Sequence, residues 1–110
     1  MLKGIIFVTI KYKYIGDKMK KYYRVKKGDT LLMIAEDFLI PPFKLIADNA
    51  LSGEVYQGQV LIIDKLERKL YRVKPFDTIK SVCANFCIST EDFISINKTD
   101  YIYPGILVYV

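Results

Sequence analysis

Apolar residues recur in two different rhythms along the chain. From residue 23 to residue 26 they alternate with basic residues, which predicts a half-buried strand. After a turn at 28–30 the spacing changes to three and four residues. This predicts a helix whose apolar face is Leu31, Ile34, Ala35 and Phe38. Pro41-Pro42 suits the first turn of a second short helix with Leu45 and Ile46 facing inward, and the apolar residues 60–63 predict a second strand.

The same order of residues returns 48 positions later. Tyr-Arg-Val-Lys at 23–26 recurs at 71–74, and Asp-Thr at 29–30 recurs at 77–78. Between residues 23 and 49 there are ten identities in 27 aligned positions, and after one deleted residue Gly58 falls on Gly105. A fixed register of this length indicates an internal repeat. The chain therefore divides into a first unit at 22–64, a charged linker at 65–70 and a second unit at 71–110.

The second unit keeps the predicted elements of the first. Its apolar helix face is Ile79, Val82, Cys83 and Phe86. Its second helix begins at Ser89, where Asp92 comes close to a capping box, and Phe93 and Ile94 face inward. The last strand is predicted at 107–110. We expect an α+β chain of two small strand–helix–helix–strand units, each with a two-stranded antiparallel sheet and two helices packed on one face.

Composition narrows the classes of function. The 110 residues include no His, no Trp and only two Cys. The usual general base at neutral pH and the commonest metal ligand are therefore missing. Two Cys make neither a four-ligand zinc site nor a disulfide framework. Enzymes of the Ser–His or Cys–His type are excluded, and we expect no catalysis, no metal and no cofactor.

The net charge of +5 lies in one segment of the chain. Residues 1–22 contain six Lys and one Asp, and residues 23–110 have no net charge. Since a nucleic-acid-binding domain carries its positive charge on the folded part, we expect no nucleic-acid partner. The apolar run at 5–10 is too short for a signal peptide or a membrane span. Residues 1–21 are expected to form a basic arm or an added strand, unless the protein starts at Met19 and residues 1–18 lie upstream of it.

Two strings of residues carry a family resemblance. The first unit has Tyr-Arg-Val-Lys-Lys-Gly-Asp-Thr-Leu at 23–31, followed by Ile34, Ala35, Phe38, Ile40, Leu45, Asn49, Leu51, Val55, Tyr56, Gly58 and 61–63. The second unit has the matching types at 71–74, 77–79, Val82, Phe86, Ile88, Ser89, Phe93, Asn97 and 103–105. In type, order and spacing, both strings resemble the lysin motif, or LysM, family. The resemblance covers residues 22–64 and 70–110.

The resemblance implies a module that binds N-acetylglucosamine-containing glycan, either peptidoglycan or a chitin-type oligomer, in a shallow groove between two loops. Loop backbone groups suit the acetamido amide, and an apolar side chain suits its methyl group. Such a ligand needs no charge, in keeping with the neutral residues 23–110. The implied carbohydrate-binding residues are Gly28, Asp29, Thr30, Leu31, Asn49, Ala50, Leu51 and Ser52 in the first unit, and Phe76, Asp77, Thr78, Ile79, Asn97, Lys98 and Thr99 in the second.

Several of these residues also have a structural interpretation. The two Asp-Thr pairs are of the types that cap helices. Asn49 and Asn97 suit the end of the second helix because Asn tolerates left-handed geometry and bonds to its own backbone. Leu51 and Ile96 either line a groove or fill the core.

Three further side chains are interpreted on packing grounds. Tyr56 and Tyr103 are expected to be core or rim aromatics. Cys83 lies on an apolar helix face and four residues from Cys87, so a buried free thiol is favoured over a redox pair.

The second unit departs from the family pattern. Phe76 stands where the first loop usually has Gly, so its ring is expected to fill or reshape the groove. Leu39 and Cys87 replace a helix-ending Gly, and we expect both helices to end in a different way. Residues 98–100 replace the apolar loop residue that Leu51 supplies. The first unit is therefore expected to be the better binder.

Two other functions compete with non-catalytic glycan binding. The first is a structural assembly protein, because LysM-like modules occur in spore-coat proteins and in phage tails, where coat or tail proteins would be the partners. The second is a wall hydrolase with a carboxylate pair drawn from residues 36–37 and 91–92, although an ordinary solvated surface explains those residues. Glycan binding places the protein at the cell wall or spore surface, and assembly into a particle needs no signal peptide.

Overall fold

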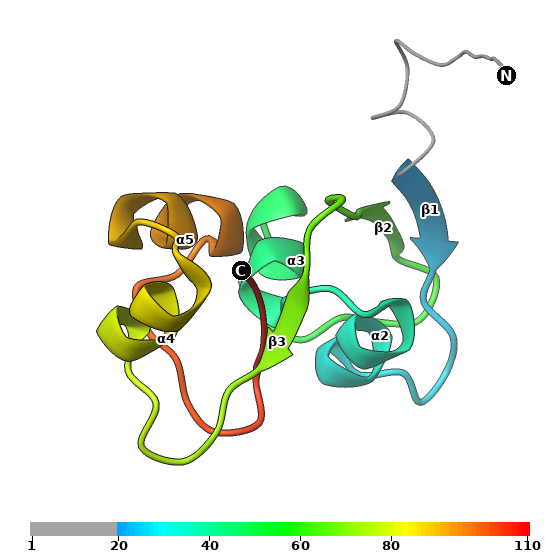
Figure 1. Ribbon diagram of the computed structural model, residues 1–110. Coiled ribbons are helices and arrows are strands. Elements are labelled where there is room, and N and C mark those ends of the chain that lie inside the picture. Colours follow the sequence, from blue (N-terminus) through cyan, green and yellow to red (C-terminus); the bar gives the residue numbers. More distant parts are fainter. Residues whose placement is uncertain (1–19) are drawn as a thin grey trace, which may run out of the picture.

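The computed structural model describes residues 20–110, which form two units with the same order of elements (Figure 1). The first unit consists of β1 (Lys20–Arg24), α2 (Leu31–Phe38), α3 (Pro42–Asp48) and β2 (Val60–Asp64). The second consists of β3 (Leu70–Arg72), α4 (Ile79–Phe86), α5 (Thr90–Asn97) and β4 (Leu107–Tyr109). The predicted α+β class and the order strand, helix, helix, strand are confirmed. The basic arm expected before the first unit lies outside the described residues as far as residue 19.

Each unit has its own two-stranded antiparallel sheet, as predicted. The strands start earlier than the apolar pattern indicated, since β1 begins at Lys20 and β3 begins at Leu70, the last residue of the expected linker. Because side chains alternate along a strand, each sheet has an inner face toward its own helices and an outer face. The outer faces are formed by the cross-strand pairs Tyr22–Ile62 and Arg24–Val60 in the first unit, and Leu70–Tyr109 and Arg72–Leu107 in the second.

The two units also have separate apolar cores. The first core is built on Val25, Leu31, Ile34, Ala35, Ile40, Leu45, Val55, Leu61 and Ile63, and the second on Val73, Val82, Cys83, Phe93, Ile106 and Val108. The helix faces expected from the spacing of apolar residues point into these cores. Burial of such side chains is the main stabilising contribution, at about 25 cal/mol per Å² of apolar surface.

Ile94 was expected to face inward, and this expectation is wrong. In α5 the buried residues are Phe93 and Asn97, which are one turn apart. Ile94 is turned by about 100° from Phe93 around the helix axis, so its side chain lies at the surface. The buried face of α5 is thus shared by an aromatic and an amide side chain.

The starts of the helices follow the expected capping chemistry. Thr30 accepts a hydrogen bond from the Met33 amide, and Thr78 accepts one from the Ser81 amide. Ser81 donates to and accepts from the Thr78 backbone as well, which completes a capping box. These bonds satisfy amides that have no partner within the helix.

The ends of α2 and α4 differ from the sequence-based expectation. Leu39 and Cys87 do not change the way the helix ends: both take the left-handed conformation that Gly usually supplies, with φ of 55° and 57°. Ile40 then donates to the Ala35 carbonyl, and Ile88 donates to the Cys83 carbonyl. This is the Schellman pattern, which pairs the last helical carbonyls, so the chain accepts a strained residue to obtain it.

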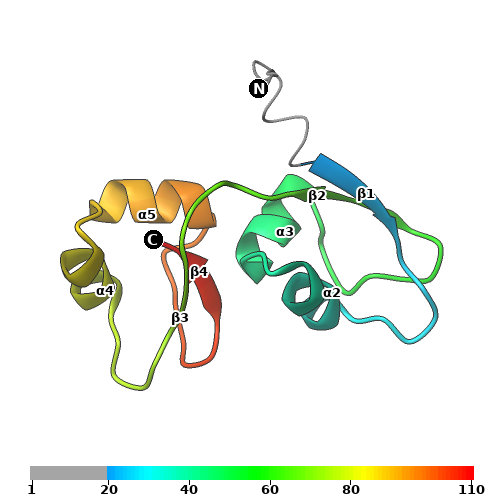
Figure 2. The same cartoon turned by 45° about the vertical axis from the view of Figure 1, so that its right-hand side comes forward.

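The two units pack against each other. In Figures 1 and 2, β3 and β4 lie between α4 and α5 on one side and the helices of the first unit on the other. Phe43 of α3 packs on the second core, and α3 contacts α5. The sheet formed by β1 and β2 lies at the far edge of the molecule.

Candidate functional site

An open depression of about 350 Å³ lies where the two implied binding loops of the first unit meet. We call it the first-unit groove, and it is lined by Leu31, Ile46, Leu51, Ser52, Gly53 and Glu54. Leu31 is the first residue of α2, and residues 51–54 belong to the loop between α3 and β2. Three of the implied residues therefore line one depression, and Ile46, Gly53 and Glu54 complete it without having been expected there.

A tight turn supports the loop before α2. The Asp29 carboxylate accepts hydrogen bonds from the Tyr23 hydroxyl and, at 2.9 Å, from the Lys26 amide. The Tyr23 hydroxyl is the larger cause and the Lys26 amide the next, and together they hold the pKa of Asp29 below its usual value. Gly28 has φ of 88°, a region that favours glycine. Asp29 is thus a turn-holding residue, while Thr30 is the helix cap.

The second unit repeats this turn. Asp77 accepts from the Tyr71 hydroxyl and from the Lys74 amide at 2.8 Å, and its pKa is lowered for the same reasons in the same order. Phe76 takes the place of Gly28 and keeps its left-handed backbone, with φ of 71°. Its ring is 100% exposed. The ring therefore does not fill a groove, contrary to that part of the expectation.

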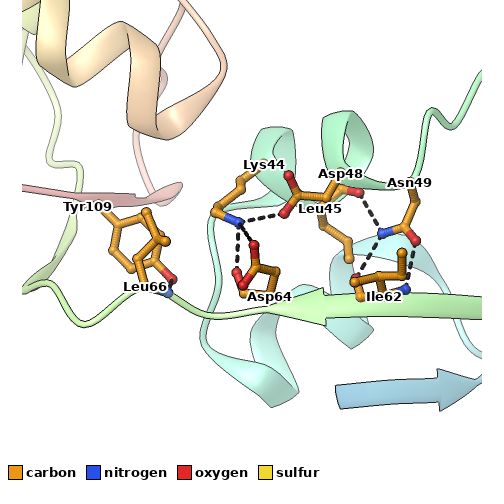
Figure 3. A network of polar contacts seen from close by, with 8 residues as sticks. All are labelled: Lys44, Leu45, Asp48, Asn49, Ile62, Asp64, Leu66 and Tyr109. Atoms are coloured by element: carbon orange, nitrogen blue, oxygen red, sulfur yellow. Dashed lines mark hydrogen bonds and ion pairs between the residues drawn. The ribbon is translucent and has the colours of Figure 1, made fainter. Parts of the chain in front are cut away.

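Asn49 ties the second loop of the first unit to the sheet. Its side-chain amide donates to the carbonyls of Leu45 and Ile62 at 3.0 and 2.9 Å, and its side-chain oxygen accepts from the Ile62 amide at 2.7 Å (Figure 3). Asn49 does not take the left-handed conformation that was expected; Ala50 does, with φ of 50°. The Asn49 backbone stays close to the helix because the amide reaches back one turn to Leu45.

Asn97 makes the same three bonds in the second unit. It donates to Phe93 and Tyr109 and accepts from the Tyr109 amide, at 2.7 to 3.0 Å. Its side chain is fully buried, so it has no surface to offer a glycan. The left-handed residue is again the next one, Lys98.

Glu54 joins the two walls of the first-unit groove. One carboxylate oxygen accepts from the Leu31 amide at 2.7 Å and from the Val55 amide at 3.0 Å. A carboxylate is favoured at this place because Leu31 is the first residue of a helix, where the amides point outward and carry partial positive charge. The second unit has Tyr101 and Ile102 in the corresponding stretch, so neither can repeat this link.

The remaining implied residues of the second unit have separate surroundings. Ile79 packs against the second core. Thr99 closes a local turn by accepting from the Tyr101 amide at 3.0 Å. Lys98 turns toward the first unit and lines a crevice of about 260 Å³ there. This inter-unit crevice is formed by Lys44, Asp48, Asp64, Leu66, Ser95, Ile96 and Lys98.

The structure also places the side chains that the sequence could assign to a groove, the core or the surface. Leu51 does both things, because it packs on the first core and lines the first-unit groove. Ile96 lines the inter-unit crevice. Tyr56 and Tyr103 are surface aromatics, and Cys83 is buried and free, with burial raising the pKa of its thiol.

A network of polar contacts holds α3 to the chain that leads into the second unit (Figure 3). The buried ammonium of Lys44 lies 2.5 Å from Asp48, and it donates to the Asp64 backbone carbonyl at 2.7 Å. The Asp64 carboxylate is 3.6 Å away. The adjoining Leu66 amide donates to the Tyr109 hydroxyl at 3.0 Å, which connects this segment to β4.

Three of the four candidate carboxylates for hydrolysis lie in an ion pair or at the start of a helix. Glu36 forms an exposed ion pair with Arg72 of the second unit, with 2.5 Å between the closest atoms. Glu91 and Asp92 lie in the first turn of α5, where negative charge stabilises a helix. Among residues 20–110 no three His, Cys, Asp or Glu side chains come together in a group that could hold a metal ion. In that part of the chain no helix is long and apolar enough to cross a membrane.

Comparison with known proteins agrees with these two units. The model of the LysM domain matches residues 23–64 and 71–106. An autolysin of Enterococcus faecalis is 29% identical over 109 residues, which covers 81% of this chain and 15% of that protein. Among solved structures, the spore cortex-lytic enzyme SleL of Bacillus megaterium is 29% identical with a TM-score of 0.42. SleL of Bacillus cereus is 21% identical with a TM-score of 0.41, and each match covers 84% of this chain and 22% of that structure.

The fold and the repeat define a tandem of two strand–helix–helix–strand units. The chain belongs to the LysM domain family, which it matches twice. At the level of that family it is a peptidoglycan-binding module. It spans about 15% of the length of the autolysin it matches.

Proposed function

We propose that the first unit binds the N-acetylglucosamine-containing glycan of peptidoglycan in the first-unit groove, without catalysis. The observation that carries the proposal is the depression itself, which opens between the two loops that the family resemblance implies. Residues of both loops line the depression, so the proposal does not depend on one side chain. From the family membership we also propose that the protein acts at the cell wall or spore surface.

The lining of the groove suits an acetamido sugar. Leu31, Ile46 and Leu51 provide an apolar floor for the acetyl methyl group and one face of the ring. Ser52 and Glu54 at the edge provide a hydroxyl and a carboxylate for sugar hydroxyls and the amide N–H. Because Glu54 already joins both walls, the groove is held open in its shape before the ligand arrives, which lowers the entropic cost of binding.

The test is retention of the full chain on purified insoluble peptidoglycan, with chitin in parallel. Leu51→Asp places a charge on the groove floor and should lower retention about tenfold or more, a loss of at least about 1.4 kcal/mol of binding free energy. Thr99→Asp introduces the same charge at the corresponding position of the second unit and is the matched control. It should leave retention unchanged. Circular dichroism of each variant checks that it is folded.

Three results contradict the proposal. The first is a wild type that binds neither polymer. The second is an equal loss of retention in the two variants. The third is a folded Leu51→Asp variant that binds as well as the wild type. Retention on chitin alone would support binding in the first-unit groove but would identify a chitin-type glycan as the ligand instead of peptidoglycan.

A further inference from the structure

The outer faces of the two sheets are covered very differently although they correspond residue by residue. Leu107 and Tyr109 on the outer face of the second unit are 7% and 1% exposed. The corresponding residues of the first unit, Val60 and Ile62, are 49% and 37% exposed. The sequence is apolar at both sets of positions, but one set is covered and the other is open to solvent.

The cover of the second sheet comes from the helical side of the first unit over Leu107, and from the linker, whose Leu66 amide donates to the Tyr109 hydroxyl. A depression of about 270 Å³ between the units is lined by α2 and α3 residues together with Leu107, so the two surfaces face each other. Phe43 packs on the second core beside it. At the edge, the Glu36 carboxylate of α2 pairs with the Arg72 guanidinium of the second sheet. The pairing lies at the rim of an apolar contact.

The first sheet has the same features without the cover. Arg24 corresponds to Arg72, and both guanidinium groups donate to the carbonyl of the matching glycine, Gly58 at 3.2 Å and Gly105 at 2.9 Å. Within residues 20–110 Arg24 has no carboxylate at ion-pair distance, whereas Arg72 has Glu36. Tyr22, opposite Ile62, is also largely exposed. We call Tyr22, Arg24, Val60 and Ile62 the open sheet face.

The second unit of another copy does not fit the open sheet face. The cover used inside this chain consists of apolar residues and one carboxylate on the helical side, among them Leu32, Glu36 and Phe43. The second unit has Lys80, Ala84 and Glu91 at those positions. It therefore lacks both the apolar surface and the carboxylate facing the arginine, and head-to-tail growth from identical chains is disfavoured.

We propose that the open sheet face docks a further LysM repeat of the first-unit type. The helical side of that repeat brings apolar residues over Val60 and Ile62, and a carboxylate to Arg24. The joint would copy the one that already connects the two units of this chain. This surface is separate from the first-unit groove, so docking and glycan binding can be tested independently.

The experiment places residues 1–69 ahead of residues 22–110, which gives three units in which Tyr22 follows Lys69 just as Leu70 does in the natural linker. An Ile62→Cys substitution in the unit that is now central reports on the open sheet face, in a Cys87→Ser background. Cys83 is buried and reacts slowly. The rate of thiol labelling should fall about tenfold relative to the two-unit chain with the same substitutions, because a docked repeat covers the site.

The matched control carries Leu32→Lys, Glu36→Ala and Phe43→Glu in the added copy only, which gives that copy the residues of the second unit. Its labelling rate should return to that of the two-unit chain. Small-angle scattering gives a second readout, with a compact third unit expected for the first protein and a loosely tethered one for the control. Equal labelling rates in all three proteins, or protection that persists in the control, would overturn the proposal.

Discussion

Asp29 and Asp77 bear the same relation to their turns, and this predicts how stability depends on pH. Each carboxylate accepts from a tyrosine hydroxyl first and a backbone amide second, which lowers its pKa in the folded state. In the unfolded chain these bonds are lost and the pKa returns to about 3.9. The stabilisation is therefore complete above about pH 4 and disappears as the pH falls through the lower, folded-state pKa.

We expect the free energy of unfolding of the wild type to fall between about pH 4 and pH 2, and to fall less steeply in the Asp29→Asn, Asp77→Asn chain. Urea unfolding followed by circular dichroism at several pH values measures the slope. Tyr23→Phe with Tyr71→Phe removes the larger cause and should give an intermediate slope. Identical slopes in the wild type and the double Asn variant would show that other carboxylates carry the effect.

Asn97 and Asn49 make equivalent bonds in different surroundings, and the difference predicts unequal effects. Asn97→Ala leaves a buried amide and two buried carbonyls short of partners and should lower the free energy of unfolding by about 3 kcal/mol. Asn49 is half-buried, so water can replace the lost bonds and Asn49→Ala should lower it by about 1 kcal/mol. Equal losses from the two substitutions in urea titrations would contradict this account.

At the scale of elements, the helix ends predict a stabilising change. Cys87 is exposed and has φ of 57°, so its side chain contributes strain without burial. Left-handed geometry costs an L residue about 1–2 kcal/mol, and glycine loses about 0.5–1 kcal/mol in backbone entropy. Cys87→Gly should therefore raise the free energy of unfolding by about 0.5–1 kcal/mol. Cys87→Ala keeps the strain, and an equal gain from it would point to loss of the thiol instead.

The helices and strands were predictable because the internal repeat shows the same pattern of apolar residues twice. Both aligned repeats have the strand alternation and the helical spacing of apolar residues. Where one repeat departs from the pattern by chance, the other still indicates the element. The helix ends were not predictable in this way. No glycine marks Leu39 or Cys87, and only the backbone bonds of Ile40 and Ile88 show that the ordinary left-handed ending is kept.

The groove was predictable in its place and not in its full lining. Leu31, Leu51 and Ser52 come from the loops that the family resemblance implies, and these loops do meet. Glu54 was missed because its role depends on a helix start 23 residues earlier in the chain. No pattern of neighbouring residues predicts a contact between the Glu54 carboxylate and the distant Leu31 amide. An acidic residue in one unit with no counterpart in the other was the available signal.

At the scale of the whole molecule, two ionic contacts between or beside the units should respond differently to salt. Glu36 and Arg72 are about half exposed, so Glu36→Gln should cost less than about 1 kcal/mol, and nothing at 1 M NaCl. Lys44 is buried beside Asp48 and Asp64. Lys44→Met should cost about 2 kcal/mol at either salt concentration. Urea unfolding at 0.05 and 1 M NaCl compares them, and a Lys44→Met cost that vanishes in salt would contradict the buried network.

The packing of the two units could have been inferred from a feature of the sequence other than alternation. Residues 106–110 are apolar without interruption, and a continuous apolar run is typical of a strand buried on both faces. The matching stretch of the first unit is equally apolar at 60–63, yet only one of its faces is buried. An apolar run shows that both faces of a strand are suited to burial. It does not show whether another part of the molecule covers both faces.

The position of β4 at the joint sets an order for folding during synthesis. A ribosome delivers the first unit complete, with its helical side exposed, before Leu107 to Tyr109 are made. Domains emerging in this way tend to fold in sequence. β3 has to wait for β4 as its only pairing partner among residues 20–110, and β4 finds the surface that covers it already assembled. We therefore expect β4 to complete the second sheet and to join the two repeats in the same folding step.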